Sequence, residues 1–417
     1  MSRHHTKEQT EEIAVDAGIL VPLDLPEFCV LKQEWSGDGS LCVTLIAKTK
    51  TATCPRCHQC CEQMHDCRER VKRDINLRDY PMTLILLKRR FRCRVCRKPF
   101  TEPDTAYGPR RRTTAWLREA IGRQAATQPV AHVAQSFRVG ARFVGDCFQH
   151  LARPLLEQRG LSLEKQNALP TPRSLGLDEF AMHKGHRYAT ILCDLEAGQV
   201  LEGSDGRRLE DVVPLLKRLA TPQQVEAVSM DMSASFAPAV RACLPHAQIV
   251  IDHFHVIQHV MKAFRKVVSA WAHKKEGQIL LYHKQHLFLR AQESLTQDEQ
   301  AERARIGSHL SELEVAWQLK ETLRTWYATA TIETAEQQLD DWIDQVREKG
   351  PDALRQALSA FIKWKQEILA FFRFLPTRIS NGFVEGKNNR TKAIMRQAYG
   401  YRNLGNLRLR ILIGDAV

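Results

Sequence analysis

Three acidic residues lie in settings suited to phosphodiester chemistry. Asp178 in LDEFA and Asp231 in SMDMS each end an apolar, strand-like run, and Glu385 is the single carboxylate of the basic, amide-rich stretch from Ser380 to Asn403. Cleavage and transfer of a phosphodiester use two divalent ions about 3.5 to 4 Å apart, which serve the attacking and the leaving oxygen. Because hard oxygen ligands suit Mg²⁺, the sequence predicts that Asp178, Asp231 and Glu385 form a catalytic site for Mg²⁺ or Mn²⁺.

Cysteine spacing predicts a second metal centre. Cys54 and Cys57 form one C-x-x-C motif, and Cys93 and Cys96 form another. The two-residue spacing lets one tight turn aim both sulfurs at one ion, and two such turns complete a tetrahedral zinc site. A closed site of four cysteines is typical of structural zinc. Five neighbouring residues remain alternative ligands: His58, Cys60, Cys61, His65 and Cys67.

Residues 174 to 252 predict the elements that position the two aspartates. Apolar runs and turn signals indicate three strands, a helix, a strand, a helix and a last strand that ends at Asp252. This order matches the RNase H-like fold, in which the first and fourth strands lie side by side. Asp178 and Asp231 should therefore be neighbours, with Asp252 one strand further out.

Three residues at the end of the last strand, and one beside Asp178, have less certain roles. Asp252, His253 and His255 are candidates for supporting the metal ligands or positioning DNA, with a structural hydrogen bond as the alternative. Glu179 should alternate to the opposite face of its strand from Asp178, so it is not expected in the site.

A helix is predicted to carry Glu385 to the aspartates. Ser380 or Asn381 can cap this helix, and Gly400 can end it. Gly386 costs about 1 kcal/mol in a helix interior, which indicates a close approach to the backbone there. Glu385 shares its helical face with residues that can bind phosphate, namely Asn388, Asn389, Lys392 and Arg396.

Basic residues near the cysteines predict a DNA-binding zinc ribbon. Two strand-like segments, joined by a turn at residues 79 to 81, connect the C-x-x-C motifs. The second motif lies in a cluster of lysines and arginines, which favours contact with phosphate. The formal net charge of +13 also favours a polyanionic partner.

A helix-turn-helix is predicted to follow the ribbon. Thr113 or Thr114 can cap a helix that runs to about Ala126. Residues 130 to 137 then form the first helix of the motif, residues 138 to 140 the turn, and Ala141 begins the candidate recognition helix. The DNA contacts predicted along the whole chain are Arg89, Arg90, Arg94, Arg142, Lys387, Asn388, Lys392 and Arg396.

The pattern as a whole predicts a multidomain α/β protein: an N-terminal zinc ribbon and helix-turn-helix, then an RNase H-like catalytic domain interrupted by an all-helical insertion. The insertion holds five of the seven tryptophans, predicted to be core, with base stacking as the alternative. No apolar run approaches the roughly 20 residues that span a bilayer, and the polar start of the chain lacks the apolar segment of a signal peptide, so a cytoplasmic location is expected. The predicted segments are 1–25 (tail), 26–112 (ribbon), 113–160 (helix-turn-helix), 161–260 and 377–417 (catalytic), and 261–376 (insertion).

These motifs together resemble the ISL-three family of bacterial insertion-sequence transposases. The resemblance covers nearly the whole chain and rests on the paired C-x-x-C motifs, the helix-turn-helix, LDEFA, SMDMS, DHFHV at residues 252 to 256 and SNGFVEGKNNRTKAIMRQAYGYRN. Such proteins are DDE recombinases, so the resemblance implies that Asp178, Asp231 and Glu385 are the metal-binding triad. It also implies that Lys392 contacts the substrate DNA.

The resemblance implies a function as well. Such a transposase binds the ends of its insertion sequence and catalyses Mg²⁺-dependent DNA cleavage and strand transfer. Its partners are double-stranded terminal inverted repeats, target DNA and further copies of itself, in the bacterial cytoplasm at the nucleoid and without a membrane. A domesticated transposase acting as a DNA-binding regulator is one alternative, although it predicts an interrupted triad and all three acids are present. An RNase H-like nuclease is another, although it needs neither the DNA-binding modules nor the insertion.

Overall fold

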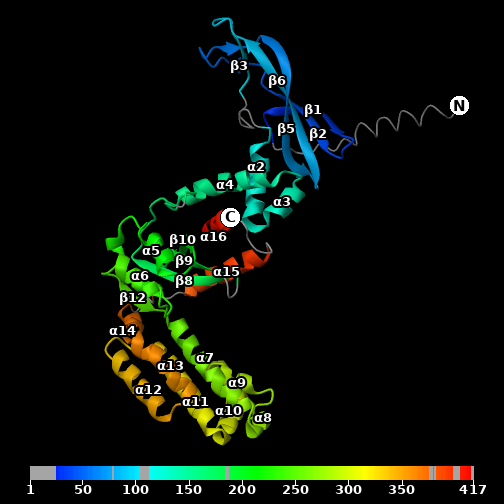
Figure 1. Ribbon diagram of the computed structural model, residues 1–417. Helices are drawn as coiled ribbons and strands as arrows, with labels where there is room; N and C mark the ends of the chain where they lie inside the picture. The colour runs from blue at the N-terminus through cyan, green and yellow to red at the C-terminus, as the bar shows by residue number, and fades with distance from the viewer. Residues whose placement is uncertain are drawn as a thin grey trace, which may run out of the picture. The chain divides into compact units, whose positions relative to one another are not determined.

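The structure is a computed structural model that describes residues 25–77, 79–103, 112–164, 166–183, 187–374, 379, 382–397 and 404–414. The chain divides into two compact units, Met1–Pro154 and Leu155–Ala416, and each is considered by itself. The elements are labelled in Figure 1. The predicted N-terminal tail lies outside the described residues, apart from Leu25.

The first unit contains a sheet with the strand order β1-β2-β6-β5, with β7 paired to β6. β2 and β6 run parallel, and the other pairs are antiparallel. Alternate residues of β2 and β6, such as Val43 and Leu84, form a hydrophobic core on one face. The strands are β1 (Phe28–Trp35), β2 (Leu41–Ala47), β5 (Met64–Leu77), β6 (Tyr80–Arg92) and β7 (Pro99–Thr101), with a separate pair β3 (Ala52–Thr53) and β4 (Cys60–Cys61).

The turn between β5 and β6 is shorter than predicted. Asp79 has a φ of +67°, in the left-handed region that such a tight turn uses. Tyr80 and Pro81 were expected in the turn but belong to β6, where Pro81 is buried. The ring of Tyr80 packs edge-on against Trp35 at 5.2 Å between centroids, which explains why this residue joins the sheet.

Three helices follow the sheet: α2 (Ala115–Thr127), α3 (Val130–Ser136) and α4 (Ala141–Glu157). Thr114 caps α2 as predicted, since its side chain accepts a hydrogen bond from the Leu117 N–H at 3.2 Å. Gly122 allows α2 and α4 to pack closely, because a Cβ there would lie 2.9 Å from the Cys147 carbonyl oxygen. The predicted helices and the turn between α3 and α4 are therefore present in the first unit.

Side chains of β5 hold these helices against the sheet. Thr114 Oγ1 donates to the buried carboxylate of Asp74 at 2.5 Å, Arg73 Nη2 donates to the Phe137 carbonyl at 3.2 Å, and Asn76 Nδ2 donates to the Ser136 carbonyl at 3.1 Å.

The second unit contains a mixed sheet with the strand order β10-β9-β8-β11-β12. β8, β9 and β10 are antiparallel, whereas β11 is parallel to both β8 and β12. The predicted order of strands and helices is confirmed, and the first strand lies beside the fourth. The elements are β8 (Ser174–His183), β9 (Arg187–Asp194), β10 (Gln199–Asp205), α5 (Leu209–Leu216), β11 (Ala227–Met230), α6 (Phe236–Cys243) and β12 (Gln248–Ile251).

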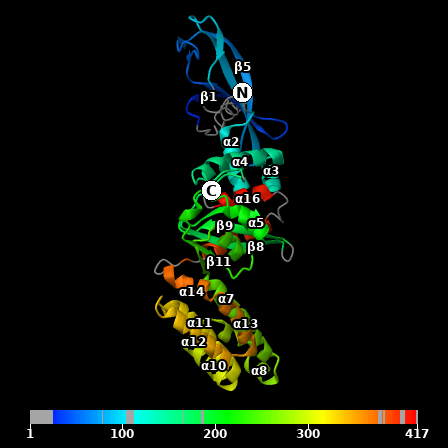
Figure 2. The same cartoon turned by 60° about the vertical axis from the view of Figure 1, so that its left-hand side comes forward.

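A helical segment follows the sheet, and α7, α11, α12 and α13 run alongside one another in it (Figure 2). Its helices are α7 (His253–Ala272), α8 (Lys275–Leu280), α9 (Gln285–Leu289), α10 (Gln297–His309), α11 (Ser311–Thr329), α12 (Ala335–Lys349), α13 (Asp352–Lys363) and α14 (Lys365–Leu369), with short 3-10 turns at Gln292–Ser294 and Ala370–Phe374. Because α7 begins directly after β12, the boundary predicted at residues 260 and 261 falls inside one helix.

Most tryptophans of this segment form its core, as predicted. Trp326 and Trp342 are 4% and 3% exposed, and their ring N–H groups donate to the carbonyls of Ala335 and Leu319. Trp317 and Trp364 are also buried, and Trp271 is partly buried. Base stacking by the four buried rings is excluded in this structure.

Two helices end the described chain, α15 (Gly382–Gln397) and α16 (Leu404–Ile413). α15 packs on β8, and α16 packs on β10. The predicted caps Ser380 and Asn381 and the predicted terminator Gly400 lie outside the described residues.

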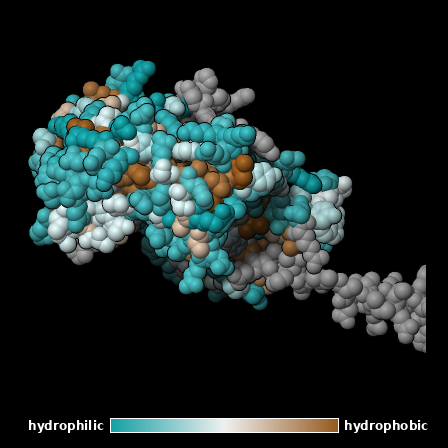
Figure 3. All heavy atoms as spheres, turned by 90° about the horizontal axis from the view of Figure 1, so that it is seen from below, coloured by the Kyte–Doolittle hydropathy of each residue, from teal (hydrophilic) through white to brown (hydrophobic). Residues whose placement is uncertain are grey.

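The surface seen in Figure 3 is mainly hydrophilic, with scattered hydrophobic residues. Among the described residues, no helix combines the length and apolarity needed to cross a bilayer.

Candidate active site and metal centre

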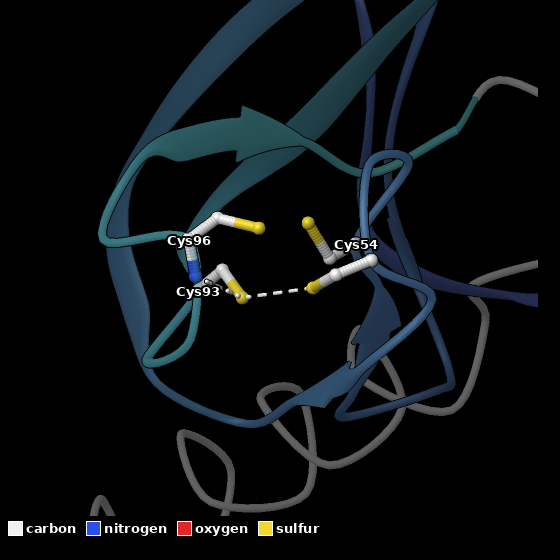
Figure 4. A group of neighbouring side chains, drawn as sticks. Cys54, Cys93 and Cys96 are labelled. Carbon is white, nitrogen blue, oxygen red and sulfur yellow. Dashed lines mark hydrogen bonds between the residues drawn. The ribbon is translucent and has the colours of Figure 1, made fainter.

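The four predicted cysteines converge in the first unit (Figure 4). The sulfurs of Cys54, Cys57, Cys93 and Cys96 all lie within 4.8 Å of one another. The two motifs have matching turns, because the residue after each second cysteine, His58 and Arg97, has a φ of +57° and +55°. Among the described residues this is the one group of three or more potential metal ligands at such distances, and the alternatives His58, Cys60, Cys61, His65 and Cys67 are not members of it.

The environment of these thiols favours a bound cation. Backbone N–H groups of Cys96 and Val95, with the neighbouring thiols, lower the pKa of Cys93 to about 6. The contact with Cys57 and burial raise the pKa of Cys96 to about 12. Four thiolates cannot ionise together at this distance without a cation to offset their repulsion. The cluster therefore has the ligands, geometry and charge requirement of a structural zinc site.

The two predicted aspartates lie at the same level on neighbouring parallel strands. Ser229 of β11 pairs with Gly176 of β8, and Asp231 and Asp178 each follow two residues later. Asp178 is 7% exposed. It lies in the middle of β8 and not at its end as predicted, because the strand continues through the buried Phe180 and stays paired with β9.

Burial raises the pKa of both carboxyl groups. The pKa of Asp178 rises to about 6, with repulsion from Asp231 adding to the effect of burial, while His255 lowers it. Burial also raises the pKa of Asp231, with repulsion from Glu179 adding to the effect, while His255 lowers it. Asp231 Oδ1 is buried and has no hydrogen-bond partner among the described residues. A buried, mutually repelling carboxylate pair with an unpartnered oxygen is suited to a cation, which would offset both charges.

Helix α15 meets this pair through Asn388. Its Nδ2 atom donates to Asp178 Oδ2 at 2.7 Å, and the side chain is buried at 2% exposure. Glu385 lies one helical turn earlier on the same face, half-buried and without a hydrogen bond or ion pair to any described residue. Among the described residues, the carboxylates of Asp178, Asp231 and Glu385 do not all lie within 4.8 Å of one another. In this structure an amide, which does not repel Asp178, takes the contact instead.

The three residues after β12 separate into two environments. Asp252 is 1% exposed, and its Oδ1 lies 3.4 Å from His253 Nδ1. It faces the helical segment, since its charge contributes to the raised pKa of the buried Tyr327. His255 instead acts on both Asp178 and Asp231, and its Nε2 is buried without a hydrogen-bond partner in the part of the chain that the structure describes. Of the three candidates, His255 is therefore the one whose charge acts on the aspartate pair.

Two residues near the pair were missed from the sequence. Glu179 accepts a hydrogen bond from Arg207 Nη1 at 2.8 Å, and the charges of both residues contribute to the pKa of Asp231. Strand alternation sets only the direction of the Cα–Cβ bond, so it did not exclude a long carboxylate side chain from influencing Asp231. No sequence signal connects Arg207 with this position.

The predicted DNA contacts differ in their accessibility. Arg89 was predicted to contact DNA, but it is buried, where it pairs with Glu102 at 2.8 Å and also donates to the Thr49 carbonyl. Asn388 was also predicted to contact DNA, but its amide is buried against Asp178. Arg90 pairs with Asp66 at 2.7 Å, and Lys387 lies over the Phe383 ring at 4.9 Å. The side chains of Arg94, Arg142 and Arg396 are exposed, and that of Lys392 is half-buried.

Known proteins with similar sequences identify the class of enzyme. A family model described as "Transposase", that of the ISL3 DDE transposases, matches residues 175–411, more than half of the chain. The transposase for insertion sequence element IS1001 of Bordetella parapertussis is 28% identical over 386 residues, covering 90% of this chain and 92% of the relative. The transposase for IS1557 of Mycobacterium tuberculosis is 23% identical over 323 residues, covering 70% and 68%.

The chain is thus a transposase, an enzyme that catalyses DNA transposition. It belongs to the ISL3 family of DDE transposases.

Proposed function

We propose that Asp178, Asp231 and Glu385 bind the catalytic Mg²⁺ or Mn²⁺ of this transposase, which cleaves DNA at the ends of its element and transfers the strands to a target. The buried aspartate pair carries the proposal, because no described residue donates a hydrogen bond to Asp231 Oδ1 and each carboxyl group has a raised pKa. Glu385 completes the set because it lies on the face of α15 that contacts Asp178.

The chain's own residues prepare this site. The bound metal would supply activation of the attacking oxygen and stabilisation of the leaving oxygen. Asn388 and the Glu179 N–H hold the two oxygens of Asp178 in place, at 2.7 and 2.8 Å. His255, Lys262 and Arg207 supply positive charge at Asp231, and Lys392 and Arg396 bind the flanking phosphates. In this proposal the five-stranded sheet is an RNase H-like domain, formed by residues 161–260 and 377–417, and residues 261–376 are its helical insertion.

The first unit recognises the element ends in this proposal. The four-cysteine cluster holds structural zinc in a ribbon spanning residues 26–112, and α3 and α4 form the helix-turn-helix of residues 113–160. Arg90, Arg94 and Arg142 contact the DNA, and α4 is the recognition helix. Several copies of the chain assemble on the paired terminal inverted repeats and the target, in the bacterial cytoplasm.

Strand transfer from precleaved ends tests the triad. We expect Asp178→Asn, Asp231→Asn and Glu385→Gln each to bind end DNA nearly as the unchanged protein does, but to lose Mg²⁺-dependent nicking and joining. The amide substitutions keep size and remove the charge that binds the metal. Glu226→Gln is the matched control, because Glu226 is an exposed acid directly before β11, and it should join DNA normally.

The outcomes separate the three assignments. Normal joining by Asp178→Asn or Asp231→Asn would overturn the metal site at the aspartate pair. Normal joining by Glu385→Gln alone, with both aspartate variants inactive, would remove only Glu385 from it.

A further inference from the structure

The outer face of α7 carries an open groove beside the aspartate pair. The groove has a volume of about 320 Å³ and is lined by Phe254, Ile257, Gln258, Met261, Lys262 and Arg265. The lining residues recur once per helical turn, at positions 254, 257–258, 261–262 and 265, so they form one stripe along the helix. The groove thus begins one residue before His255, whose charge acts on both aspartates.

The charge of this stripe is not neutralised. α7 contains no aspartate or glutamate, and its exposed cations Lys262, Arg265 and Lys266 form no ion pair or side-chain hydrogen bond with any residue that the structure describes. Several other cations of the helical segment are paired, as in Arg290 with Glu299 and Arg305 with Glu302. An acid-free row of unpaired cations is suited to a polyanion.

The apolar side chains of the groove are unusually exposed. Phe254 remains 36% exposed although it is among the largest apolar side chains of α7, and Ile257 and Met261 are only partly buried. The groove is therefore lined by an aromatic ring, two aliphatic side chains and two cations. This combination fits the face of a nucleic-acid base whose phosphates follow the cations.

The groove lies near the proposed catalytic site. The rings of Phe254 and His255 lie 6.1 Å apart, at an interplanar angle of 76°. Lys262, one of the lining residues, is also close enough to Asp231 for its charge to lower the pKa of that carboxyl group. A strand that leaves the aspartate pair along α7 would meet the ring first and the cations next.

We propose that this groove binds an unpaired DNA segment next to the scissile phosphate, with a base stacked on Phe254 and the backbone held by Lys262 and Arg265. The proposal rests on the proposed function, since it takes its substrate from there. A fully paired duplex is the weaker occupant, because its base faces are covered by their own stack and only base edges and phosphates are accessible. The ring would then contact nothing.

Binding of two end substrates by the full-length chain tests this proposal without any chemistry. One substrate is a fully paired end, and the other carries a short single-stranded overhang at the cleavage position, with 2-aminopurine as its first unpaired base. We expect Phe254→Ala to bind the overhang about 10-fold more weakly, with unchanged binding of the paired end and loss of the 2-aminopurine quenching. Phe254→Tyr keeps the aromatic ring and should retain both the overhang binding and the 2-aminopurine quenching.

The cations and a control complete the design. Lys262→Gln and Arg265→Gln should each reduce the slope of log K against log salt for the overhang by about 0.7, the value for one phosphate contact on a single strand. Ile332→Ala is the control, because Ile332 is 55% exposed on the same helical segment but outside the groove. Ile332→Ala should leave the binding of both substrates and the 2-aminopurine quenching unchanged.

The outcomes keep the two proposals apart. Normal overhang binding and quenching by Phe254→Ala would overturn the groove, as would equal weakening on both substrates, which would indicate a duplex or a general folding defect. If the aspartate variants still join DNA but Phe254→Ala loses the overhang, the groove stands and the metal triad fails.

Discussion

At the scale of single residues, Asn388 connects α15 with the aspartate pair. Its amide fixes Asp178 Oδ2 without adding charge, so Asn388→Ala should leave that oxygen free to turn away from a bound metal. Loss of a group that orients a metal ligand costs about 10- to 100-fold in metal affinity or activity. We therefore expect strand transfer by Asn388→Ala to need more Mg²⁺, measured as a Mg²⁺ titration of the joining rate.

Asn389→Ala is the control for that experiment. Asn389 is the next residue, but its side chain is exposed and forms no hydrogen bond to a described residue. An unchanged Mg²⁺ requirement in Asn388→Ala would show that the hydrogen bond to Asp178 is only structural.

The buried carboxyl group of Asp74 makes stability depend on pH. Burial raises the pKa of Asp74, against the lowering effect of the Thr114 hydrogen bond. The folded pKa thus lies above the unfolded value of about 3.9, so ionising Asp74 costs stability at every pH above that value. Asp74→Asn keeps an oxygen for Thr114 without the charge. It should raise Tm at pH 7, with a gain that shrinks as pH falls toward about 4.

Thermal unfolding between these pH values measures the effect. Glu69→Gln, at an exposed position of the same strand, should show no gain that depends on pH. A lower Tm for Asp74→Asn at pH 7 would mean that the charge of Asp74 stabilises the fold through its neighbour Arg73.

At the scale of elements, the cysteine turns depend on their metal. Cys54→Ser or Cys93→Ser should release zinc and disorder both turns, because each removes a buried ligand and metal binding contributes folding free energy directly. Zinc content by elemental analysis and binding to end DNA should fall together. Cys67→Ser is the control, since Cys67 is exposed and outside the cluster. Full zinc content in Cys54→Ser would move the ligands to other residues.

Gly386 lies in helix α15, where glycine lowers helix stability, and no contact with the described residues requires a glycine there. A Cβ on Gly386 would meet no atom within 4 Å, so Gly386→Ala should stabilise the helix by about 1 kcal/mol. If DNA approaches the backbone beside Glu385, the added methyl group obstructs it. We expect a higher Tm together with weaker joining, measured on the same preparation. A higher Tm with full joining would leave the glycine without a role in substrate binding.

At the scale of the whole second unit, a buried charge network attaches the C-terminal helix. Arg408 of α16 donates to both oxygens of Glu202 on β10 at 2.7 and 2.8 Å, and Glu202 also pairs with Arg218. Glu202 is 1% exposed. Removing one partner from a buried pair costs about 3 to 5 kcal/mol, so Arg408→Ala should strongly lower the free energy of unfolding.

Chemical denaturation measures this loss, and a surface pair provides its control. Arg347 and Asp344 pair on the exposed face of α12, where a salt bridge contributes about 0 to 1 kcal/mol. Arg347→Ala should therefore change little. Equal losses in both variants would mean that α16 is not held by its buried charges.

The features that local chemistry determines could be predicted from the sequence. Two-residue cysteine spacing requires a turn that brings both sulfurs to one side, and the structure has four such sulfurs together. Apolar runs and turn residues predicted the strands of the second unit, whose order brings Asp178 beside Asp231. The Thr114 cap is equally local, because it needs only the backbone three residues ahead.

Contacts between distant segments could not be predicted, because periodicity assigns a side chain to a face but not to a partner. The sequence predicted Arg89 to be a surface cation, but in the folded protein it is buried in an ion pair with Glu102. Asn388 looked like a phosphate ligand, but it lies 210 residues from the Asp178 carboxylate that it binds. Glu385 shares that helical face, yet its distance from the aspartates depends on how α15 packs on β8. Only the tertiary structure decides such contacts, since burial and the repulsion between charges act on the folded arrangement as a whole.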